Sequence, residues 1–427
     1  MNLYLGIDFG TSGARAIVID SAGIIQAESQ YSFTDSTDDL ITVWRQALFS
    51  LISEIPSEIR GGICAIAING TSSTVLLCDR TGNPIDSPIL YNDSRGVKLI
   101  DKLRQIAPLN HTVISATSSL AKLFWYQENI PLIPPLLRGA RGDLSFLHQA
   151  DWLAFLLHGQ LGISDYHNAL KLGYDVEKLC YPKWIQNLEI PFQLPNVLTP
   201  GTAIAEVTTE IAANLKLRKD CIVCAGTTDS IAAFLASGAK SPGEASTSLG
   251  STLVIKLLSS TRVDDAKYGI YSHRLGDLWL VGGASNTGGA VLKSFFSDAE
   301  LENLSSQIDA EKASSLDYYP LLKAGDRFPI NDPNLPPKLD PRPENPVEFL
   351  HGLLESIARI EARGYELLKQ LGATPLTCVY TAGGGAKNPT WTKIRERYLQ
   401  VPILKPTHRQ AAYGSAILAM EGINKKI

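Results

Sequence analysis

Residues 6–20, GIDFGTSGARAIVID, are the stretch that most constrains the fold of this chain. Two apolar runs of strand character flank a turn of small residues at 10–13, which predicts a β-hairpin. One carboxylate, Asp8, stands at the end of the first run, where a buried strand is expected. A charge at such a position costs free energy unless it is paired or serves a function. Taken alone, the stretch slightly favours a plain hairpin in which Asp8 caps the turn.

A phosphate site is the other interpretation of this hairpin. Its turn exposes successive backbone N–H groups and the hydroxyls of Thr11 and Ser12, and such a concavity binds phosphate oxygens. Arg15 adds positive charge shortly after the turn. Asp8 would repel bound phosphates unless a divalent cation lay between them, and Mg²⁺ needs few protein ligands because it keeps several waters. This interpretation predicts hydrated Mg²⁺ at Asp8.

The expected order of elements is duplicated along the chain, although no repeat is visible residue by residue. Each half carries a strand, a turn of small residues and a second strand, followed by further strands and helices. A capping pair, Ser36 and Asp39, is expected at the first helix. Strands are expected within residues 3–9, 14–20, 24–31, 61–70, 244–258, 268–273, 278–284 and 377–385, and helices within 36–55, 288–296, 348–372 and 390–400.

The length and net charge of the chain limit the classes of protein to which it can belong. The chain has 427 residues, which exceeds what one core usually supports, so two domains are expected, over 1–235 and 240–427. One alternative stays open, in which the last helix packs back on the first domain. The net charge of −4 argues against nucleic acid as a partner, and no apolar run approaches the roughly 20 residues that span a bilayer.

The N-terminus and the cysteines bear on the compartment. The first residues lack a secretory signal, so we expect a cytoplasmic protein, or one of the plastid stroma if a transit peptide has been removed. Cys221 and Cys224 have the spacing of redox and metal sites. Their segment is expected to be a buried strand, in which residues three apart point to opposite faces, and no second pair completes a zinc site. We interpret them as core cysteines.

Two further small-residue segments strengthen the phosphate interpretation. Residues 246–254 form a second glycine, serine and threonine turn at the matching place in the second half. Residues 381–391 place three glycines between an expected strand and an expected helix, where a flat ligand can approach the backbone. Asn388 follows and can bind an amide or a base edge. Together these segments predict two phosphate turns and a nucleoside pocket.

With these motifs in order, the chain resembles the FGGY family of carbohydrate kinases, within the superfamily of actin and the heat-shock chaperone ATPases. The resemblance covers nearly the whole chain and includes the stretches GIDFGTSGARA, NDSR, SLAKLFWYQEN, ISDYHNALKLGYD, AGTTDS, SLGST, GDRFP and TAGGGAKNPTW. It implies an α/β fold of two RNase H-like (actin-like ATPase) domains with the active site in a cleft between them. ATP and Mg²⁺ are the implied cosubstrate and cofactor, and a sugar is the implied substrate.

The resemblance also implies roles for individual residues. Asp229, in the G-T-x-D motif, matches the general base that accepts the proton of the sugar hydroxyl; a simple helix N-cap is the alternative. Asp8 matches the magnesium-associated carboxylate, and both aspartates are expected at the sugar and, through water, at the metal. Nucleotide contacts are expected from Thr11, Ser12, Arg15, Gly250, Ser251, Gly289, Gly384, Gly385, Asn388 and Trp391. Ordinary helix packing is nearly as good an interpretation of Trp391.

The sugar loop is where the chain departs from its relatives. Glycerol kinases place Arg-Glu after the strand that ends near residue 70, and typical xylulokinases place Gln-Met-His there. This chain has GTSST, so Thr71 and Ser72 are expected to face the sugar. Small hydroxyl residues leave room for a longer polyol and resemble the loop of ribulose- and ribitol-type kinases. D-ribulose is therefore the favoured substrate.

Three alternatives stay open: D-xylulose or another polyol as the substrate, an actin-like ATP-binding module without sugar kinase activity, and a degenerate kinase acting as a scaffold.

His148 and His167 are expected to be surface residues or structural residues whose ring nitrogens have hydrogen-bond partners. Tyr126 occupies a position where the family signature prefers an aliphatic residue. No membrane or nucleic-acid partner is expected, and the protein is expected to be a monomer or a homodimer.

Overall fold

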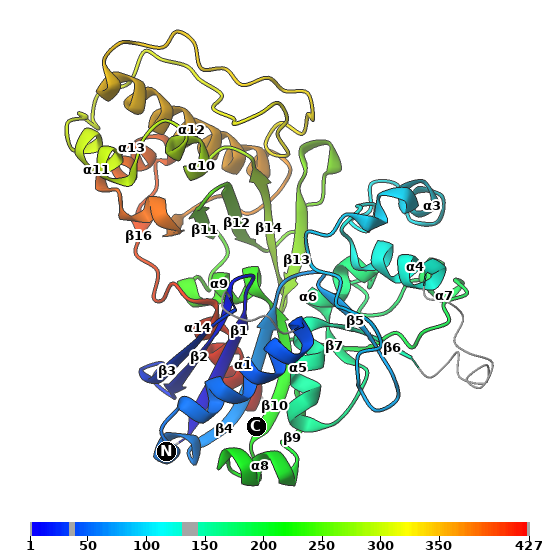
Figure 1. The fold of residues 1–427 in the computed structure, drawn as a ribbon. Helices are drawn as coiled ribbons and strands as arrows, with labels where there is room; N and C mark the ends of the chain where they lie inside the picture. The colour runs from blue at the N-terminus through cyan, green and yellow to red at the C-terminus, as the bar shows by residue number, and fades with distance from the viewer. Residues whose placement is uncertain (1, 34–38, 130–143, 425–427) are drawn as a thin grey trace. The chain divides into compact units, whose positions relative to one another are not determined.

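The computed structural model describes residues 2–33, 39–129 and 144–424. The chain separates into two compact units. Unit 1 comprises Met1–Ala236 and His408–Ile427, and unit 2 comprises Ser237–Thr407. The chain therefore leaves unit 1 once and returns to it for its last helix. Each unit is built around one six-stranded sheet (Figure 1).

The sheet of unit 1 has the strand order β3-β2-β1-β4-β10-β9. Its first three strands form the antiparallel meander that the sequence predicts, and β4 and β10 extend it with parallel pairing to β1 and to each other. Every residue of β4 is buried, as expected for a strand covered on both faces. The strands are β1 Leu3–Phe9, β2 Gly13–Asp20, β3 Ile25–Ser32, β4 Ile63–Gly70, β9 Ala203–Glu206 and β10 Ile222–Thr228.

Helices cover both faces of this sheet (Figure 1). The core on one face joins alternate residues of β1 to α1 (Leu40–Glu54) and α5 (Gln149–His158). The core on the other face joins β1 and β4 to the last helix, α14 (Ala411–Asn424). Contact there is close because a Cβ on Gly6 would lie 2.0 Å from the carbonyl oxygen of Ala412. A glycine is therefore required at position 6.

A helix cap and a pair of cysteines in unit 1 were predicted from the sequence. The side chain of Asp39 caps α1 by accepting from the backbone N–H groups of Ile41 and Thr42. Its expected capping partner, Ser36, lies outside the described residues. Cys221 and Cys224 are fully buried and belong to the cores on opposite faces of the sheet, which confirms their interpretation as core cysteines.

A smaller layer of unit 1 follows β4. It contains the two-stranded sheets β5-β6 and β7-β8, and the first of these shares a core with α4 (Ser119–Asn129). Tyr126 of α4 is fully buried in this core, which accounts for a ring at that position. The other elements are α2 Ser57–Arg60, β5 Val75–Cys78, α3 Ile100–Ile106, β6 Ser145–His148, β7 Ile163–Asp165, α6 Tyr166–Ala169, α7 Lys183–Gln186, β8 Asn196–Leu198, α8 Thr209–Leu215 and α9 Asp229–Ser237.

The sheet of unit 2 has the order β13-β14-β12-β11-β15-β16 and packs against the long helix α12 (Pro346–Gln370). The expected end of α12 is confirmed, because Gly372 adopts a left-handed φ of 99° directly after it. The other elements are β11 Glu244–Leu249, β12 Leu253–Ser259, β13 Tyr271–Leu275, β14 Leu278–Ser285, α10 Gly289–Lys293, α11 Asp298–Ser306, β15 Cys378–Ala382, α13 Pro389–Leu399 and β16 Ile403–Leu404.

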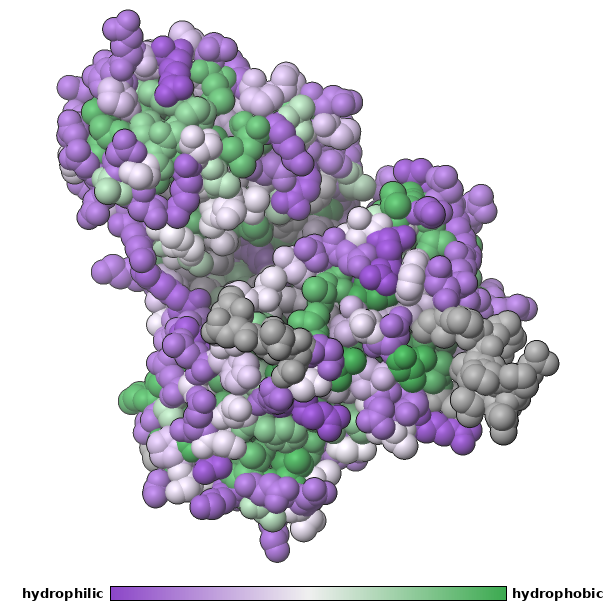
Figure 2. All heavy atoms as spheres, viewed as in Figure 1, coloured by the Kyte–Doolittle hydropathy of each residue, from purple (hydrophilic) through white to green (hydrophobic). Residues whose placement is uncertain are grey.

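Within the described ranges, no helix is long and apolar enough to cross a membrane. Hydrophilic residues occupy much of the face drawn in Figure 2.

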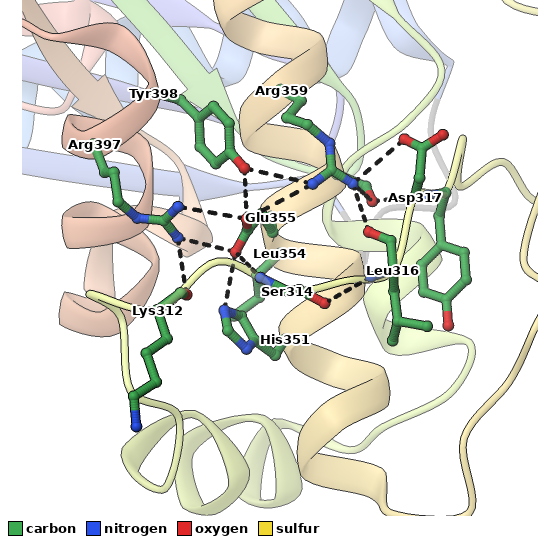
Figure 3. Close-up of polar contacts among 12 residues, drawn as sticks. Lys312, Ser314, Leu316, Asp317, His351, Leu354, Glu355, Arg359, Arg397 and Tyr398 are labelled. Atoms are coloured by element: carbon green, nitrogen blue, oxygen red, sulfur yellow. Dashed lines mark hydrogen bonds and ion pairs between the residues drawn. The ribbon is translucent and has the colours of Figure 1, made fainter.

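A buried carboxylate, Glu355, joins α12 to its neighbours in unit 2 (Figure 3). Its side chain is fully buried, and it accepts hydrogen bonds from Arg397 at 2.9 Å, from the hydroxyl of Tyr398 at 2.5 Å and from the backbone N–H of Ser314 at 3.1 Å. Burial pushes the pKa of Glu355 up, but the hydrogen bonds from Arg397 and Tyr398 outweigh it and leave the pKa below its ordinary value. This cluster therefore stabilises unit 2 in its ionised form.

Replacing Glu355 by glutamine is expected to lower the free energy of unfolding of unit 2 by about 1.5–3 kcal/mol at pH 7. Because the folded-state pKa is depressed, this stability is present above the ordinary value of 4.5 and is lost as the pH falls through the lower folded-state value. Urea unfolding of the wild type and the variant at pH 7 and at acidic pH measures this loss of stability. Glu366→Gln, at an exposed position of α12, is the control. Equal losses in both variants would contradict the account.

Candidate active site

Polar side chains stand at the carboxyl ends of three neighbouring parallel strands in unit 1. Asp8 of β1 pairs in register with Asn69 of β4, which pairs in turn with Thr227 of β10. Asp229 follows β10 directly as the first residue of α9. Asp8 and Asn69 both lie on the face that α14 covers, since Gly6 contacts α14 and Asn69 donates to the hydroxyl of Ser415 at 2.8 Å. This edge is where ligands bind in open α/β sheets.

Asp8 and Asp229, which were predicted together, influence each other electrostatically. Burial and, second to it, the negative charge of Asp229 raise the pKa of Asp8 to about 7, while the positive charge of Arg15 opposes the shift. Arg15 is the cross-strand partner of Asp8 in the hairpin, and it also donates to Gln30 at 3.1 Å. Asp229 lies directly after β10 and begins α9. Two carboxylates in one electrostatic environment favour a bound cation or a shared proton.

Unpartnered oxygen atoms at these strand ends allow a test of whether Mg²⁺ fits. Asp8 Oδ1, Asn69 Oδ1 and Thr228 Oγ1 are buried and have no hydrogen-bond partner within the described part of the chain. Carboxylate, amide and hydroxyl oxygens are hard ligands, which suit Mg²⁺. The described ranges contain no group of three or more histidine, cysteine, aspartate or glutamate side chains that could hold a metal. The residues present therefore fit an ion that keeps most of its waters.

The raised pKa of Asp8 predicts a stability effect that needs no metal. In the presence of a chelator, Asp8→Asn is expected to raise the free energy of unfolding by up to about 4 kcal/mol at pH 8. The ordinary pKa is 3.8 and the folded-state pKa is about 7, so the destabilisation caused by ionising Asp8 grows between these two values and is complete above pH 7. The difference in stability between wild type and variant should vanish at pH 4. Chemical unfolding across this range measures it, with the exposed Asp101→Asn as control. A variant no more stable than wild type at pH 8 would contradict the burial argument.

The first predicted phosphate turn is exposed. Thr11 and Ser12 lie on the surface of unit 1, and the turn is closed by a hydrogen bond from the N–H of Gly10 to the carbonyl of Gly13 at 3.0 Å. Their hydroxyls are thus accessible to a ligand, as a phosphate contact requires. The turn adjoins Asp8 in sequence, at the same sheet edge.

The structure distinguishes the two residues predicted to face the sugar. Thr71 is buried, and both its N–H and its hydroxyl donate to Oε1 of Gln149, at 3.0 and 3.1 Å. Its hydroxyl also contacts that of Thr74. Ser72 is partly exposed. Thr71 therefore has a part in holding the loop, and Ser72 is the residue of the pair that a ligand can reach.

Three predicted nucleotide segments meet in unit 2. The turn with Gly250 and Ser251 joins β11 to β12, and its carbonyls accept from the backbone N–H groups of Gly289 and Ala290 at 2.8 and 3.1 Å. Gly383 lies against the same turn, since a Cβ there would come within 2.6 Å of the backbone of Leu249. Sequence-distant glycines are thus brought to one place, which is what close approach to a ligand demands.

Beyond this turn, Gly384 and Gly385 differ in surroundings. A Cβ on Gly384 would meet nothing within 4 Å, whereas one on Gly385 would lie 2.6 Å from the ring of Trp391. Trp391 is only 2% exposed and donates from its indole N–H to the carbonyl of Leu354 at 3.1 Å. The ring therefore supports the glycine segment from the core, which favours the helix-packing interpretation of Trp391.

Asn388 is engaged within unit 2. Its Oδ1 caps α13 by accepting from the N–H of Trp391 at 3.0 Å, and its Nδ2 donates to the hydroxyl of Ser305 in α11 at 2.8 Å. One amide N–H beyond the bond to Ser305 could serve a ligand. Ser305 was not predicted from the sequence, because its partner lies 83 residues away.

A fully buried ion pair lies beneath the nucleotide segments. Arg395 of α13 donates from Nε and Nη2 to Glu361 of α12 at 2.6 and 2.7 Å, and both side chains are 0% exposed. Arg395 also donates to Thr381 of β15 at 2.8 Å, and Thr247 of β11 donates to Glu361 at 2.5 Å. The pair thus ties two helices to the two strands whose ends carry Gly250 and Gly384.

The side chains of His148 and His167 are buried and hydrogen-bonded. His148 is fully buried and its ring contacts Asp151 at 3.0 Å and Ser119 at 3.1 Å. His167 is 2% exposed and bonds the hydroxyl of Thr227 at 2.7 Å. Of the two interpretations offered, a satisfied structural role is the one that these contacts support.

Three residues adjoin the predicted site residues and were not predicted from the sequence: Asn69, Thr228 and Gln149. A polar residue at the end of the apolar strand 61–70 was the available signal for Asn69, by the same reasoning that identified Asp8. Thr228 stands beside Asp229 in the quoted AGTTDS motif. Gln149 gave no local signal, because it reaches the sugar loop from 78 residues away.

Unit 1 thus carries Asp8 and Asp229 at the carboxyl ends of its parallel strands, and unit 2 carries a group of glycine-rich turns. Residues 3–236 match the N-terminal domain of the FGGY family of carbohydrate kinases, and residues 245–422 match its C-terminal domain. The chain belongs to this family and is an ATP-dependent sugar kinase. The predicted family, fold class and enzyme class are therefore confirmed.

Individual relatives are distant in sequence. A xylulose kinase of Bacillus subtilis is 24% identical, over 99% of this chain and 88% of its own length, and a glycerol kinase of Koribacter versatilis is 24% identical, over 97% and 88%. Among solved structures, xylulose kinase from Rhodospirillum rubrum superposes with a TM-score of 0.83 at 21% identity, over 100% of this chain and 91% of that one. Plasmodium falciparum glycerol kinase with ADP gives 0.85 at 18% identity, over 100% and 90%.

Proposed function

We propose that this kinase transfers the γ-phosphoryl group of ATP to a pentulose, with D-ribulose as the favoured substrate and Asp229 as the general base. The observation that carries the proposal is the placement of Asp229 directly after β10, close enough to Asp8 for its charge to raise the pKa of that residue. Phosphoryl transfer asks a protein mainly to position groups and stabilise charge, and this arrangement supplies both.

Asp229 is suited to the role of base. It lies in the first turn of α9, where the helix dipole favours the ionised carboxylate. Its Oδ1 accepts from the backbone N–H of Ser230 at 2.6 Å, which helps to orient the group. In the proposed step the sugar hydroxyl gives its proton to Asp229 while its oxygen forms a bond to the γ-phosphorus. The bond from that phosphorus to the bridging oxygen breaks, and ADP leaves.

Residues of each unit have proposed contacts with ATP. In unit 1, the exposed hydroxyls of Thr11 and Ser12 bind phosphate oxygens, and Arg15 balances their charge. In unit 2, Gly250 and Ser251 bind phosphate, Gly289 lines the turn, and the adenosine lies along Gly384 and Gly385, with Asn388 offering one amide N–H. The open space at Gly384 supports this assignment.

Mg²⁺ would be held by Asp8 and, through water, by Asp229, with Asn69 and Thr228 supplying further oxygens. When bound, it would neutralise phosphate charge that the two carboxylates would otherwise repel. The positive charge of Arg15, beside Asp8, would offset the phosphate charge to a smaller extent.

The choice of D-ribulose rests on the sugar loop. Small hydroxyl residues at 71–74 leave room for a polyol chain, and the partial exposure of Ser72 makes it the contact that we propose for the sugar. D-xylulose is the second candidate, because several relatives are named xylulose kinase.

A panel of D-ribulose, D-xylulose, ribitol and glycerol tests the proposal, with ADP release measured by a coupled assay. We expect the highest kcat/KM with D-ribulose, and little ADP release without sugar. A higher kcat/KM with any other member would overturn the substrate assignment. A rate of ADP release that no sugar increases would contradict sugar kinase activity as a whole.

A further inference from the structure

Lys122 is buried in unit 1, and no carboxylate forms an ion pair with it in the described part of the chain. Lys122 of α4 is 0% exposed, and its Nζ donates to the carbonyl oxygens of Ser73 and Leu90, each at 2.7 Å. Lysine is almost never fully buried unless its ammonium group is paired. Here two backbone carbonyls serve as the partners, so the side chain connects two loops rather than balancing a charge.

Both loops bear on the proposed sugar contact. Ser73 directly follows Ser72 and has a φ of 66°, a left-handed conformation that is uncommon for serine. Leu90 directly precedes Tyr91, whose N–H donates to the hydroxyl of Thr74 at 3.0 Å. Lys122 therefore joins the strained turn after Ser72 to the segment that closes over Thr74.

Lys122 holds the backbone on one side of this turn, and Gln149 holds it on the other. Gln149 holds Thr71 before the turn, and its own N–H donates to the carbonyl of Thr74 at 3.0 Å. The Ser73 hydroxyl is buried without a hydrogen-bond partner in the described part of the chain, so it does not fix the turn. A left-handed serine persists only where its surroundings impose it, and the bond from Lys122 to its carbonyl does so.

Burial of the ammonium is itself unfavourable. Desolvation lowers the pKa of Lys122 to about 7, with Asp93 opposing the shift. A group that only had to fill the core of α4 could be apolar at no such cost. The cost is consistent with a role in shaping the loops.

We propose that Lys122 is a positioning residue for the sugar: it holds the carbonyls of Ser73 and Leu90 so that the loop presents Ser72 to the bound substrate. This inference rests on the proposed function, because it takes residues 71–74 as the sugar loop. It adds a residue that contacts neither substrate yet sets the affinity for one of them.

The test is Lys122→Met, which keeps an unbranched side chain as far as Cε and removes both hydrogen bonds made by Nζ. We expect the KM for the preferred sugar to rise at least about tenfold, while the KM for ATP stays within about twofold, because the nucleotide segments lie in other elements. The Kd of the sugar without ATP, measured by calorimetry, should rise by the same factor.

Ser118→Ala is the matched control. Ser118 is also fully buried, directly before α4, and among the described residues its hydroxyl bonds Val113 and Ala121, at 2.7 and 3.1 Å. It should lower the thermal midpoint to a similar degree without changing the KM for the sugar. If both variants raise that KM equally, Lys122 acts through stability alone and the proposal is overturned.

Failure of this inference can be told from failure of the proposed function. If wild type phosphorylates a pentulose and Lys122→Met leaves its KM unchanged, only the positioning role falls. If the methionine variant does not fold, Lys122→Gln carries the test, since its neutral amide keeps the site polar but stands one atom too short to bond both carbonyls as the ammonium does. A KM for the sugar that is unchanged in a folded Lys122→Gln variant would overturn the proposal, and a rise of several-fold would support it.

Discussion

Asp229→Asn is expected to lower kcat by about 10²–10⁴-fold, because asparagine keeps the shape of the side chain but cannot accept the proton of the sugar hydroxyl. Binding should survive, since the backbone N–H of Ser230 can still be satisfied by the amide oxygen. Steady-state kinetics with saturating sugar and ATP give kcat. Calorimetric titration with the sugar gives a Kd that we expect within a few-fold of the wild-type value.

Asp220→Asn is the control for this variant. Asp220 is exposed, precedes β10 and pairs only with Arg218 in the ion pairs of the described ranges. Replacing aspartate by asparagine at this exposed position should leave kcat unaltered. If Asp229→Asn kept near-normal sugar phosphorylation, another group would have to be the base, and the assignment made from the G-T-x-D motif would be wrong.

Arg395→Met should have the largest effect on stability, with a loss of about 3–5 kcal/mol in the free energy of unfolding of unit 2. The substitution leaves the fully buried Glu361 without its ion-pair partner and removes a donor to Thr381. Because β11 and β15 carry the nucleotide segments at their ends, we also expect weaker binding of ADP. Chemical unfolding and calorimetric ADP titration measure the two effects.

Lys393→Met makes the matched comparison, because Lys393 is exposed on the same helix. It should change the free energy of unfolding by less than about 0.5 kcal/mol. Replacing both partners, as in Glu361→Gln with Arg395→Met, should recover part of the loss, since no uncompensated charge then remains. An additive further loss in the double variant would contradict the assignment of the energy to the pair.

Local patterns predicted much of this fold. Alternation of apolar residues and small-residue turns located the hairpin of β1 and β2, and Gly372 marked the end of α12. Asp8 stood out because a charge at the end of a buried strand is costly. Asn69 occupies the equivalent place in the neighbouring strand, but a neutral amide gives a weaker signal than a carboxylate.

Contacts between distant residues could not be predicted in the same way. Nothing near Thr71 indicated that Gln149 would engage its hydroxyl, and nothing near Trp391 indicated that its indole would bond Leu354 instead of lining a pocket. The close approach of α14 to Gly6 joins positions about four hundred residues apart. Such pairings depend on how the sheet and helices pack, which periodicity does not encode.

We propose that Asp229 directs a phosphoryl group from ATP to a hydroxyl of a pentulose, and the family resemblance implies that this hydroxyl is the terminal one. Phosphorus NMR of the products formed from D-ribulose and ATP tests it most directly. We predict equal amounts of ADP and of one sugar phosphate, esterified at the terminal carbon, with neither formed by Asp229→Asn at a comparable rate. ADP accompanied by inorganic phosphate, in amounts independent of the sugar, would contradict the claim.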